Sequence, residues 1–234
     1  MFKNSLASKT STTLSSFWKH NLSSEYCDAT KKYPGLKDIR PIVQRLCFKK
    51  KFIPPTAHSY FNTLFNLTNF AFSSSYKIKV QQIPDKKICE FNFKLLSNIL
   101  ACRKKLYKWQ ATESANCMLC NSEETVEHLL YYCPAKLKIW NLVCSVLNIK
   151  CHVKVLVLGS SDFILDWTIS VVTYCLYKYW IWSNDAKSNE VTNVTCIRRL
   201  NQNLKNYITI YKLCNFDEGV SKRLELIFGA LSTM

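Results

Sequence analysis

Apolar side chains recur with a helical period along much of this chain. The clearest stretch follows Pro84 and Asp85, a pair typical of the start of a helix. Its apolar positions are spaced as on one face of an α-helix. They are Ile88, Phe91, Leu95, Leu96, Ile99 and Leu100. We therefore predict that the main helix of the chain begins at this point.

Similar stripes predict further helices. They cover residues 36–48, 58–70, 134–147, 192–213 and 222–231. In the third of these we expect Leu137 and Trp140 to face inward. In the fourth, Leu200 and Leu204 belong to the inward stripe, and Gly219 is expected to end that element. The pattern thus favours packed helices over most of the chain.

Two short segments leave the choice of secondary structure open. Residues 76–83 alternate polar and apolar side chains, which is typical of a strand, but no clear partner strand exists. Residues 153–159 are compatible with a strand or with the end of a helix. Little or no β-structure is therefore expected.

Residues 163–182 are apolar enough to resemble a membrane span. Asp166 and Lys178 lie inside this segment, and each would cost about 3 kcal/mol at the centre of a bilayer. A buried core helix fits better, so no membrane partner is predicted from this segment.

Composition divides the chain into four parts. Residues 1–35 begin with a Ser/Thr-rich run and are expected to be largely flexible. A basic and aromatic helical segment then covers 36–80, a central domain covers 81–150, and a C-terminal helical region covers 151–234. With only 4 Gly and 6 Pro in 234 residues, a turn-rich all-β fold is disfavoured.

The chain carries a formal net charge of +16. Such an excess favours a polyanionic partner, nucleic acid first and an anionic membrane second. The alternative is a solvated basic surface that keeps the protein soluble. A first basic cluster precedes Pro54. It consists of Lys31, Lys32, Lys37, Arg40, Arg45, Lys49, Lys50 and Lys51.

Twelve cysteines raise the question of disulfides. They are scattered along a long chain, and the N-terminus has no apolar signal region. We therefore expect reduced thiols and an intracellular location, nuclear, cytoplasmic or both. No small-molecule substrate is indicated.

Four of the metal-ligating residue types fall close together. Cys117 and Cys120 are separated by two residues, and His128 and Cys133 follow in the spacing C-x2-C-x7-H-x4-C. Three thiolates and an imidazole suit one tetrahedral Zn²⁺ ion, and four protein ligands make the site structural. The alternative is four unrelated side chains, three of them buried thiols. Cys151 and His152 lack a second pair at suitable spacing.

A basic and aromatic run precedes this motif. It consists of Arg103, Lys104, Lys105, Lys108 and Trp109. Cations beside rings can hold a phosphate backbone while the rings stack on bases. Alternatively, the cations form a solvated helix face and Trp109 fills the core. Because Glu123, Glu124 and Glu127 would repel phosphate, we expect the flanks of the metal motif to contact nucleic acid.

The flanking motifs add a resemblance. The motif F-x-x-K-L-L-x-N-I-L at 91–100 is followed by L-x-K-W at 106–109, E-x-x-E-H-L at 124–129 and Cys133-Pro134 with Trp140 beyond. This order resembles the reverse transcriptase zinc-binding segment of LINE-type (non-LTR) retrotransposon proteins, near their C-terminus. The resemblance implies a parent protein that copies its RNA at a nicked chromosomal target.

Catalysis itself is not predicted for this chain. Polymerisation needs paired aspartates for two metal ions, and the sequence contains no Asp-Asp. We predict a mainly α helical bundle with a small CCHC zinc knuckle, a non-enzymatic module that holds RNA or DNA beside a reverse transcriptase core. The alternatives are a zinc-stapled scaffold for protein contacts and a truncated element relic without function.

Overall fold

The computed structural model describes residues 77–150, 152–160, 162–185 and 190–233. The chain divides into two compact units, Met1–Phe52 and Ile53–Met234, and all described residues belong to the second. The predicted helices at 36–48 and 58–70, the flexible segment 1–35 and the first basic cluster lie outside the described residues.

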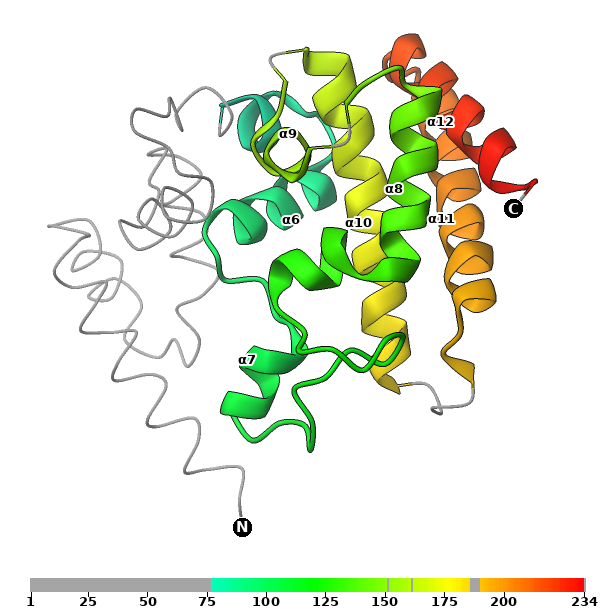
Figure 1. Ribbon diagram of the computed structural model, residues 1–234. Coiled ribbons are helices and arrows are strands. Elements are labelled where there is room, and N and C mark those ends of the chain that lie inside the picture. The colour runs from blue at the N-terminus through cyan, green and yellow to red at the C-terminus, as the bar shows by residue number, and fades with distance from the viewer. Residues whose placement is uncertain (1–76, 151, 161, 186–189, 234) are drawn as a thin grey trace, which may run out of the picture. The chain divides into compact units, whose positions relative to one another are not determined.

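The described residues are mainly helical, and no strand occurs among them (Figure 1). In chain order the helices are η1 (Lys77–Gln82), α6 (Lys86–Leu96), α7 (Arg103–Lys108), η2 (His128–Tyr132), α8 (Pro134–Val146), α9 (Val153–Leu158), α10 (Phe163–Asp185), α11 (Asn193–Leu213) and α12 (Glu218–Leu231). The labels η1 and η2 denote π-helices. The prediction of a mainly α fold is therefore confirmed.

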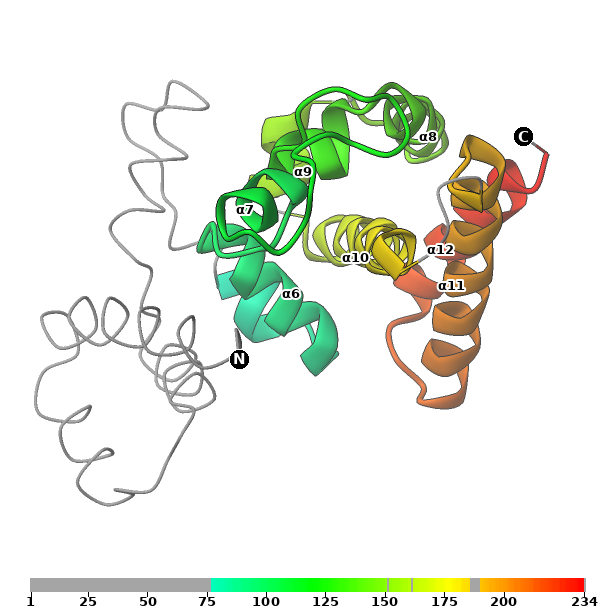
Figure 2. The same ribbon diagram turned by 90° about the horizontal axis from the view of Figure 1, so that it is seen from below.

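Helix α10 is the centre of this unit. It contacts η1, α6 and α9, and also η2, α11 and α12. Figures 1 and 2 show α10 between α6 and the α11–α12 pair. Its buried positions run all round the helix, from Leu165 to Ser183, as expected for a helix enclosed by others. No helix in the described ranges is long and apolar enough to cross a membrane.

The start of α6 follows the predicted capping. Asp85 is its N-cap, and the carboxylate accepts hydrogen bonds from the backbone N–H groups of Lys87 and Ile88. These bonds satisfy two of the amide groups that have no partner in the first turn of a helix. The buried face of α6 then packs against η1, α9 and α10.

Amide side-chain residues end several helices where glycine is scarce. After α6, α7, α8 and α11 the backbone turns into the left-handed region at Asn98, Gln110, Asn148 and Asn215. After α6, for example, the N–H of Ile99 donates to the carbonyl of Lys94 and that of Asn98 donates to Leu95. This pair of bonds is a Schellman motif, and Asn is the non-glycine residue that tolerates its conformation best.

Within segment 76–83, whose secondary structure was left open, Lys77–Gln82 form π-helix η1, and Asn92 donates a 2.9 Å hydrogen bond to the carbonyl of Lys79. Several local predictions were wrong. Ile99 is 49% exposed because α6 already ends at Leu96. Leu137, on α8, is 43% exposed, and Gly219 lies inside α12 because Asp217 caps that helix.

The division of the chain into four parts, 1–35, 36–80, 81–150 and 151–234, remains a prediction. On both sides of residue 150 the helices pack on one another, since α8 contacts α12 and α6 contacts α10. The open segment 153–159 forms the short helix α9, which Gly159 ends at φ 97°.

Candidate metal centre

The first two cysteines lie on a tight turn. The backbone N–H of Cys117 donates to the carbonyl of Ser122 at 2.8 Å, and the N–H of Asn121 donates back to the carbonyl of Cys117 at 2.9 Å. Asn121 has φ 60°, which closes the turn. An isolated antiparallel bridge joins Asn116 to Glu123 across its base. The turn therefore holds the two thiols on one short loop.

The second pair comes from π-helix η2. His128 is its first residue and Cys133 is its C-cap, and the N–H of Cys133 donates to the carbonyl of His128 at 3.1 Å. Positions five apart on an α-helix would be separated by about 140° around the axis. The wider π-turn, closed by an i to i+5 hydrogen bond, brings both side chains to one side. The predicted short helix is present in this wider form.

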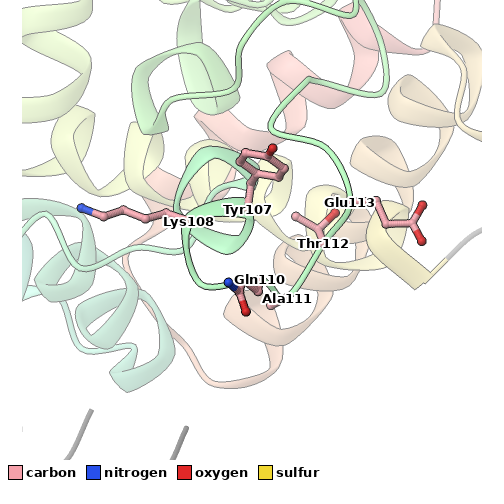
Figure 3. Close-up of a pocket in the computed structure, with 6 residues that line it drawn as sticks. All are labelled: Tyr107, Lys108, Gln110, Ala111, Thr112 and Glu113. Atoms are coloured by element: carbon pink, nitrogen blue, oxygen red, sulfur yellow. The ribbon is translucent and has the colours of Figure 1, made fainter. Parts of the chain in front are cut away.

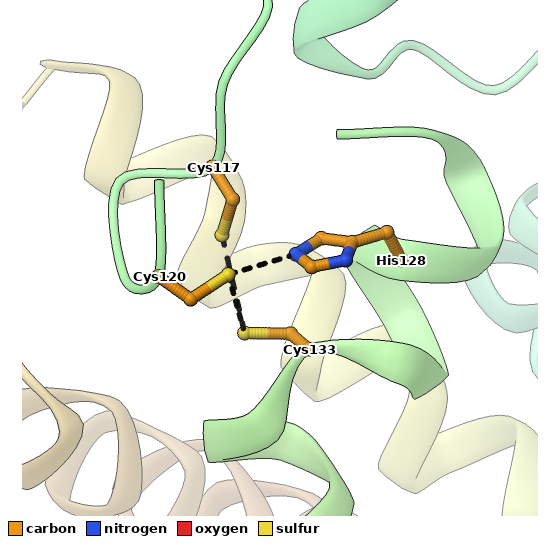
Figure 4. A group of neighbouring side chains, drawn as sticks. All are labelled: Cys117, Cys120, His128 and Cys133. Atoms are coloured by element: carbon orange, nitrogen blue, oxygen red, sulfur yellow. Dashed lines mark hydrogen bonds between the residues drawn. The ribbon is translucent and has the colours of Figure 1, made fainter. Parts of the chain in front are cut away.

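The four side chains converge on one point (Figure 4). Their ligand atoms all lie within 4.8 Å of one another. Cys133 Sγ is 3.9 Å from Cys117 Sγ and 3.9 Å from Cys120 Sγ. Two sulfurs of a tetrahedral zinc site are separated by about 3.8 Å, given Zn–S bonds of about 2.3 Å. The 3.1 Å from Cys120 Sγ to His128 Nε2 is shorter, and matches a hydrogen bond to the imidazole.

This donor set suits a single metal ion. Among the described residues it is the one group of His, Cys, Asp and Glu side chains that meets the spacing for a metal. Cys117 and Cys133 are buried, whereas Cys120 and His128 are half-buried. The cluster can therefore hold one metal ion, and with four protein donors it leaves no ligand position for water.

Protonation in the cluster follows from its hydrogen bonds. The bond between the thiols of Cys117 and Cys133 raises the pKa of Cys117, and burial adds to this effect. The same bond lowers the pKa of Cys133. Burial also lowers the pKa of His128, which favours the neutral imidazole that a metal requires. The cluster thus contains a thiol with a lowered pKa, Cys133, and a ring whose neutral form is favoured, His128.

The junction between η2 and α8 is held by side-chain donors. A π-helical bond to the carbonyl of Leu129 would come from residue 134, which is proline and has no N–H. Instead the ammonium of Lys136 donates to Leu129, and the indole Nε1 of Trp140 donates to Leu130 at 2.7 Å. Both donors are buried. These bonds fix the helix that carries His128.

Glu124 connects the loop that follows the turn of Cys117 and Cys120 to the central helix α10. Its Oε1 accepts hydrogen bonds from Trp180 Nε1 at 2.7 Å and from the backbone N–H of Arg103 at 2.9 Å. Glu124 and Glu127 are both buried. Of the three acidic side chains expected to repel phosphate at the knuckle, only Glu123 is exposed, and it is paired with Lys104.

Two of the predicted phosphate contacts are engaged within the chain. Lys105 donates from Nζ to the carbonyl oxygens of Asn98 and Leu100, at 2.8 and 3.0 Å. Arg103 donates to Thr112 and Asn184, both at 3.3 Å. These bonds anchor α7 to the loop before it and to the end of α10. The contribution of either residue to nucleic-acid contacts remains a prediction.

Three other side chains of the same run are open to solvent. Lys104 and Lys108 are exposed, and Trp109 is 48% exposed. The alternative in which Trp109 fills the core is therefore wrong. A hollow adjoins the C-terminal end of α7 (Figure 3). It is lined by Tyr107, Lys108, Gln110, Ala111, Thr112 and Glu113.

No local sequence pattern identifies several residues that support the cluster. From the sequence, Lys136 would be expected on the exposed face of an amphipathic helix, yet its side chain is buried. Glu124 reads as one of three solvated acids, and its indole partner lies 56 positions away. Contacts over such distances along the chain are set by tertiary packing, which local patterns do not encode.

The comparisons with known proteins agree with this site. Residues 56–140 match the family model described as zinc-binding in reverse transcriptase. The match contains all four clustered residues and ends at Trp140. It supports a reverse transcriptase zinc-binding domain in this part of the chain, which is an accessory domain and not a catalytic one. No curated protein and no solved structure matches the chain.

Proposed function

We propose that this chain is a zinc-stabilised nucleic-acid-binding module of a LINE-type reverse transcriptase, from the C-terminal part of such a protein. One Zn²⁺ ion is held by Cys117, Cys120, His128 and Cys133. The observation that supports it best is the convergence of these four side chains inside a matched zinc-binding segment. With four protein ligands, the ion would order the chain and would not activate water.

The proposed nucleic-acid surface is the exposed side of α7. Lys104 and Lys108 supply charge and Trp109 supplies a ring for base stacking, joined by Tyr107, which is 53% exposed. Glu123 partly neutralises Lys104. Arg103 and Lys105 hold α7 in place through their hydrogen bonds. In the parent protein, this surface would hold RNA or DNA during target-primed reverse transcription.

The chain's charge supports the same partner. The 32 Lys and Arg exceed the 16 Asp and Glu by 16, an excess that ion pairs within the chain cannot neutralise. Neutralised phosphates release counterions, so the affinity of such a surface falls steeply with salt. A protein-contact scaffold would lack that dependence.

The test measures binding of a labelled RNA hairpin, an unpaired RNA strand and a DNA duplex across a salt series, with and without zinc chelation. Lys108→Ala is expected to lower affinity several-fold and to reduce the salt slope by about one. Lys154→Ala, which removes an exposed lysine from α9, is the matched control. Equal effects of both variants, or binding unchanged by chelation, would contradict the proposed surface.

A second candidate, a zinc-stapled scaffold that contacts only protein, is favoured by exposed apolar side chains. Leu213, Val194 and Leu226 are 78%, 63% and 61% exposed. If no nucleic acid binds at low salt while a reverse transcriptase core does, this candidate replaces the first.

A further inference from the structure

One buried cation lies beside the candidate metal centre. Lys136 is in the first turn of α8, three residues after Cys133, and only 1% of it is exposed. Its backbone N–H donates to the carbonyl of Cys133 at 2.8 Å. Its ammonium reaches back over η2 to the carbonyl of Leu129, the residue that follows His128. Side chains on a helix point toward its N-terminus, which explains this direction.

This cation has no carboxylate partner at ion-pair distance among the described residues. A lysine is rarely buried unless it is paired, because removing its charge from water is unfavourable. A carbonyl oxygen satisfies one of its three donors and neutralises none of its charge. The buried carboxylate of Glu124 lies beyond ion-pair distance, so a closer anionic group is expected.

The charges that face Lys136 come from the surrounding segments. Its field acts on Cys117 and Cys133, after the larger effects of their mutual hydrogen bond and of burial on the pKa of each thiol. It also acts on His128 and on Glu124, for which burial is the larger influence on pKa. The geometry places Lys136 beside the cluster, because its ammonium bonds to the carbonyl of Leu129, next to His128, and its backbone N–H bonds to the carbonyl of Cys133.

A zinc-loaded centre would carry a net negative charge. Metal ligation requires three thiolates and a neutral imidazole, so Zn²⁺ with this donor set carries a net charge of −1. A net charge enclosed by protein is stabilised by a nearby opposite charge. We infer that Lys136 is the counter-ion of the zinc centre, so that metal affinity depends on its charge as well as on its hydrogen bond. This inference rests on the proposed zinc site.

The hydrogen bond and the charge can be separated by matched variants. Lys136→Met removes both, and Lys136→Gln removes the charge while keeping a side-chain donor. Lys136→Arg keeps the charge. Trp140→Phe removes the donor to the neighbouring carbonyl of Leu130 and leaves the charge of the chain unchanged. Circular dichroism of each full-length variant checks that it folds.

Zinc affinity is measured by competition with a chromophoric chelator at one pH, and the ligand-field spectrum of the Co²⁺-loaded protein reports the coordination geometry. We expect Lys136→Met and Lys136→Gln to weaken zinc binding by about 10- to 100-fold. Lys136→Arg should stay within about threefold of the native protein, with a tetrahedral Co²⁺ spectrum in all loaded forms.

Two results would overturn the inference. One is a zinc affinity equal to that of the native protein in both Lys136→Met and Lys136→Gln. The other is a loss of zinc affinity in Trp140→Phe as large as in these two variants, which would mean that Lys136 acts only through its hydrogen bond. If the native chain itself binds neither Zn²⁺ nor Co²⁺, the proposed zinc site fails first, and the two failures are thereby distinguished.

Discussion

The indole Nε1 of Trp180 donates a 2.7 Å hydrogen bond to Oε1 of Glu124. This contact joins the end of the central helix to the loop between the two pairs of clustered ligands. Glu124 also receives the N–H of Arg103, at the start of α7. One buried carboxylate therefore connects the core, the candidate metal centre and the proposed binding surface.

Glu124→Ala should lower the free energy of unfolding by about 2–4 kcal/mol. The substitution leaves the indole of Trp180 and the amide of Arg103 buried without an acceptor, and bonds to charged groups are the stronger class. Urea unfolding of the zinc-loaded chain measures the loss. Glu123→Ala is the control, since its ion pair with Lys104 is half exposed and contributes less than about 1 kcal/mol. A similar loss in both variants would argue against the role of Glu124.

Cys133→Ser should abolish zinc binding. It removes the thiol that lies 3.9 Å from each of the other two and replaces it with a poorer ligand for Zn²⁺. Native mass spectrometry should find one zinc in the native chain and none in the variant. Cys214→Ser, which changes an exposed free thiol outside the cluster, should keep the ion. Retention of zinc by Cys133→Ser would show that the ligands lie elsewhere.

Gly159→Ala should destabilise the fold by about 2 kcal/mol or more. Gly159 has φ 97°, and a Cβ there would lie 2.5 Å from Oδ2 of the buried Asp166. Gly229→Ala is the matched control, because nothing lies within 4 Å of its Cβ and it is inside helix α12. That control should be neutral or stabilising by up to about 1 kcal/mol. Thermal unfolding compares the two, and equal melting temperatures would be inconsistent with the close approach.

The stability of the chain should depend on Lys79 between about pH 8 and pH 10.5. Burial lowers the pKa of Lys79 from 10.5 to about 8, although the charge of Asp166 opposes the shift. In this window the unfolded chain binds more protons at Lys79 than the folded chain, so stability rises with pH. The rise is about 1.4 kcal/mol for each pH unit at its steepest.

The Lys79→Met variant isolates this effect, because the other titrating groups are common to both proteins. The difference in free energy of unfolding between the native chain and the variant should shift in favour of the native chain as pH increases from 8 to 10. Parallel stability curves would mean that the ammonium of Lys79 is not desolvated in the folded state.

The sequence was sufficient to predict features that depend on interactions between residues close together in the chain. The cap at Asp85 and the apolar stripe after it determine α6, and the spacing of Cys117, Cys120, His128 and Cys133 identifies the cluster. The extent of α6 was overestimated at Ile99. There the helix is ended by the left-handed conformation of Asn98, and asparagine is a weaker stop signal than glycine.

The remaining features depend on contacts between distant segments. The alternating pattern of residues 76–83 left a strand possible but without a partner. Lys77–Gln82 instead form a π-helix, from which Lys79 donates to the carbonyl of Leu156 at 2.7 Å. Burial of Lys79, Lys136 and Glu124 runs against the usual exposure of charged residues. Such burial is possible only where the rest of the fold supplies acceptors and donors, which a sequence pattern does not show.

The two ligand pairs differ in how they are built, and this has a consequence for metal capture. Each pair is closed by its own backbone hydrogen bonds, the turn at Cys117 and the π-turn at His128. The site thus consists of two bidentate ligand pairs, Cys117 with Cys120 and His128 with Cys133, joined by a short loop. Once either pair has bound the ion, the other pair binds it in an intramolecular step at high effective concentration. We therefore expect rapid metal binding and slow dissociation, because both pairs must release the ion together.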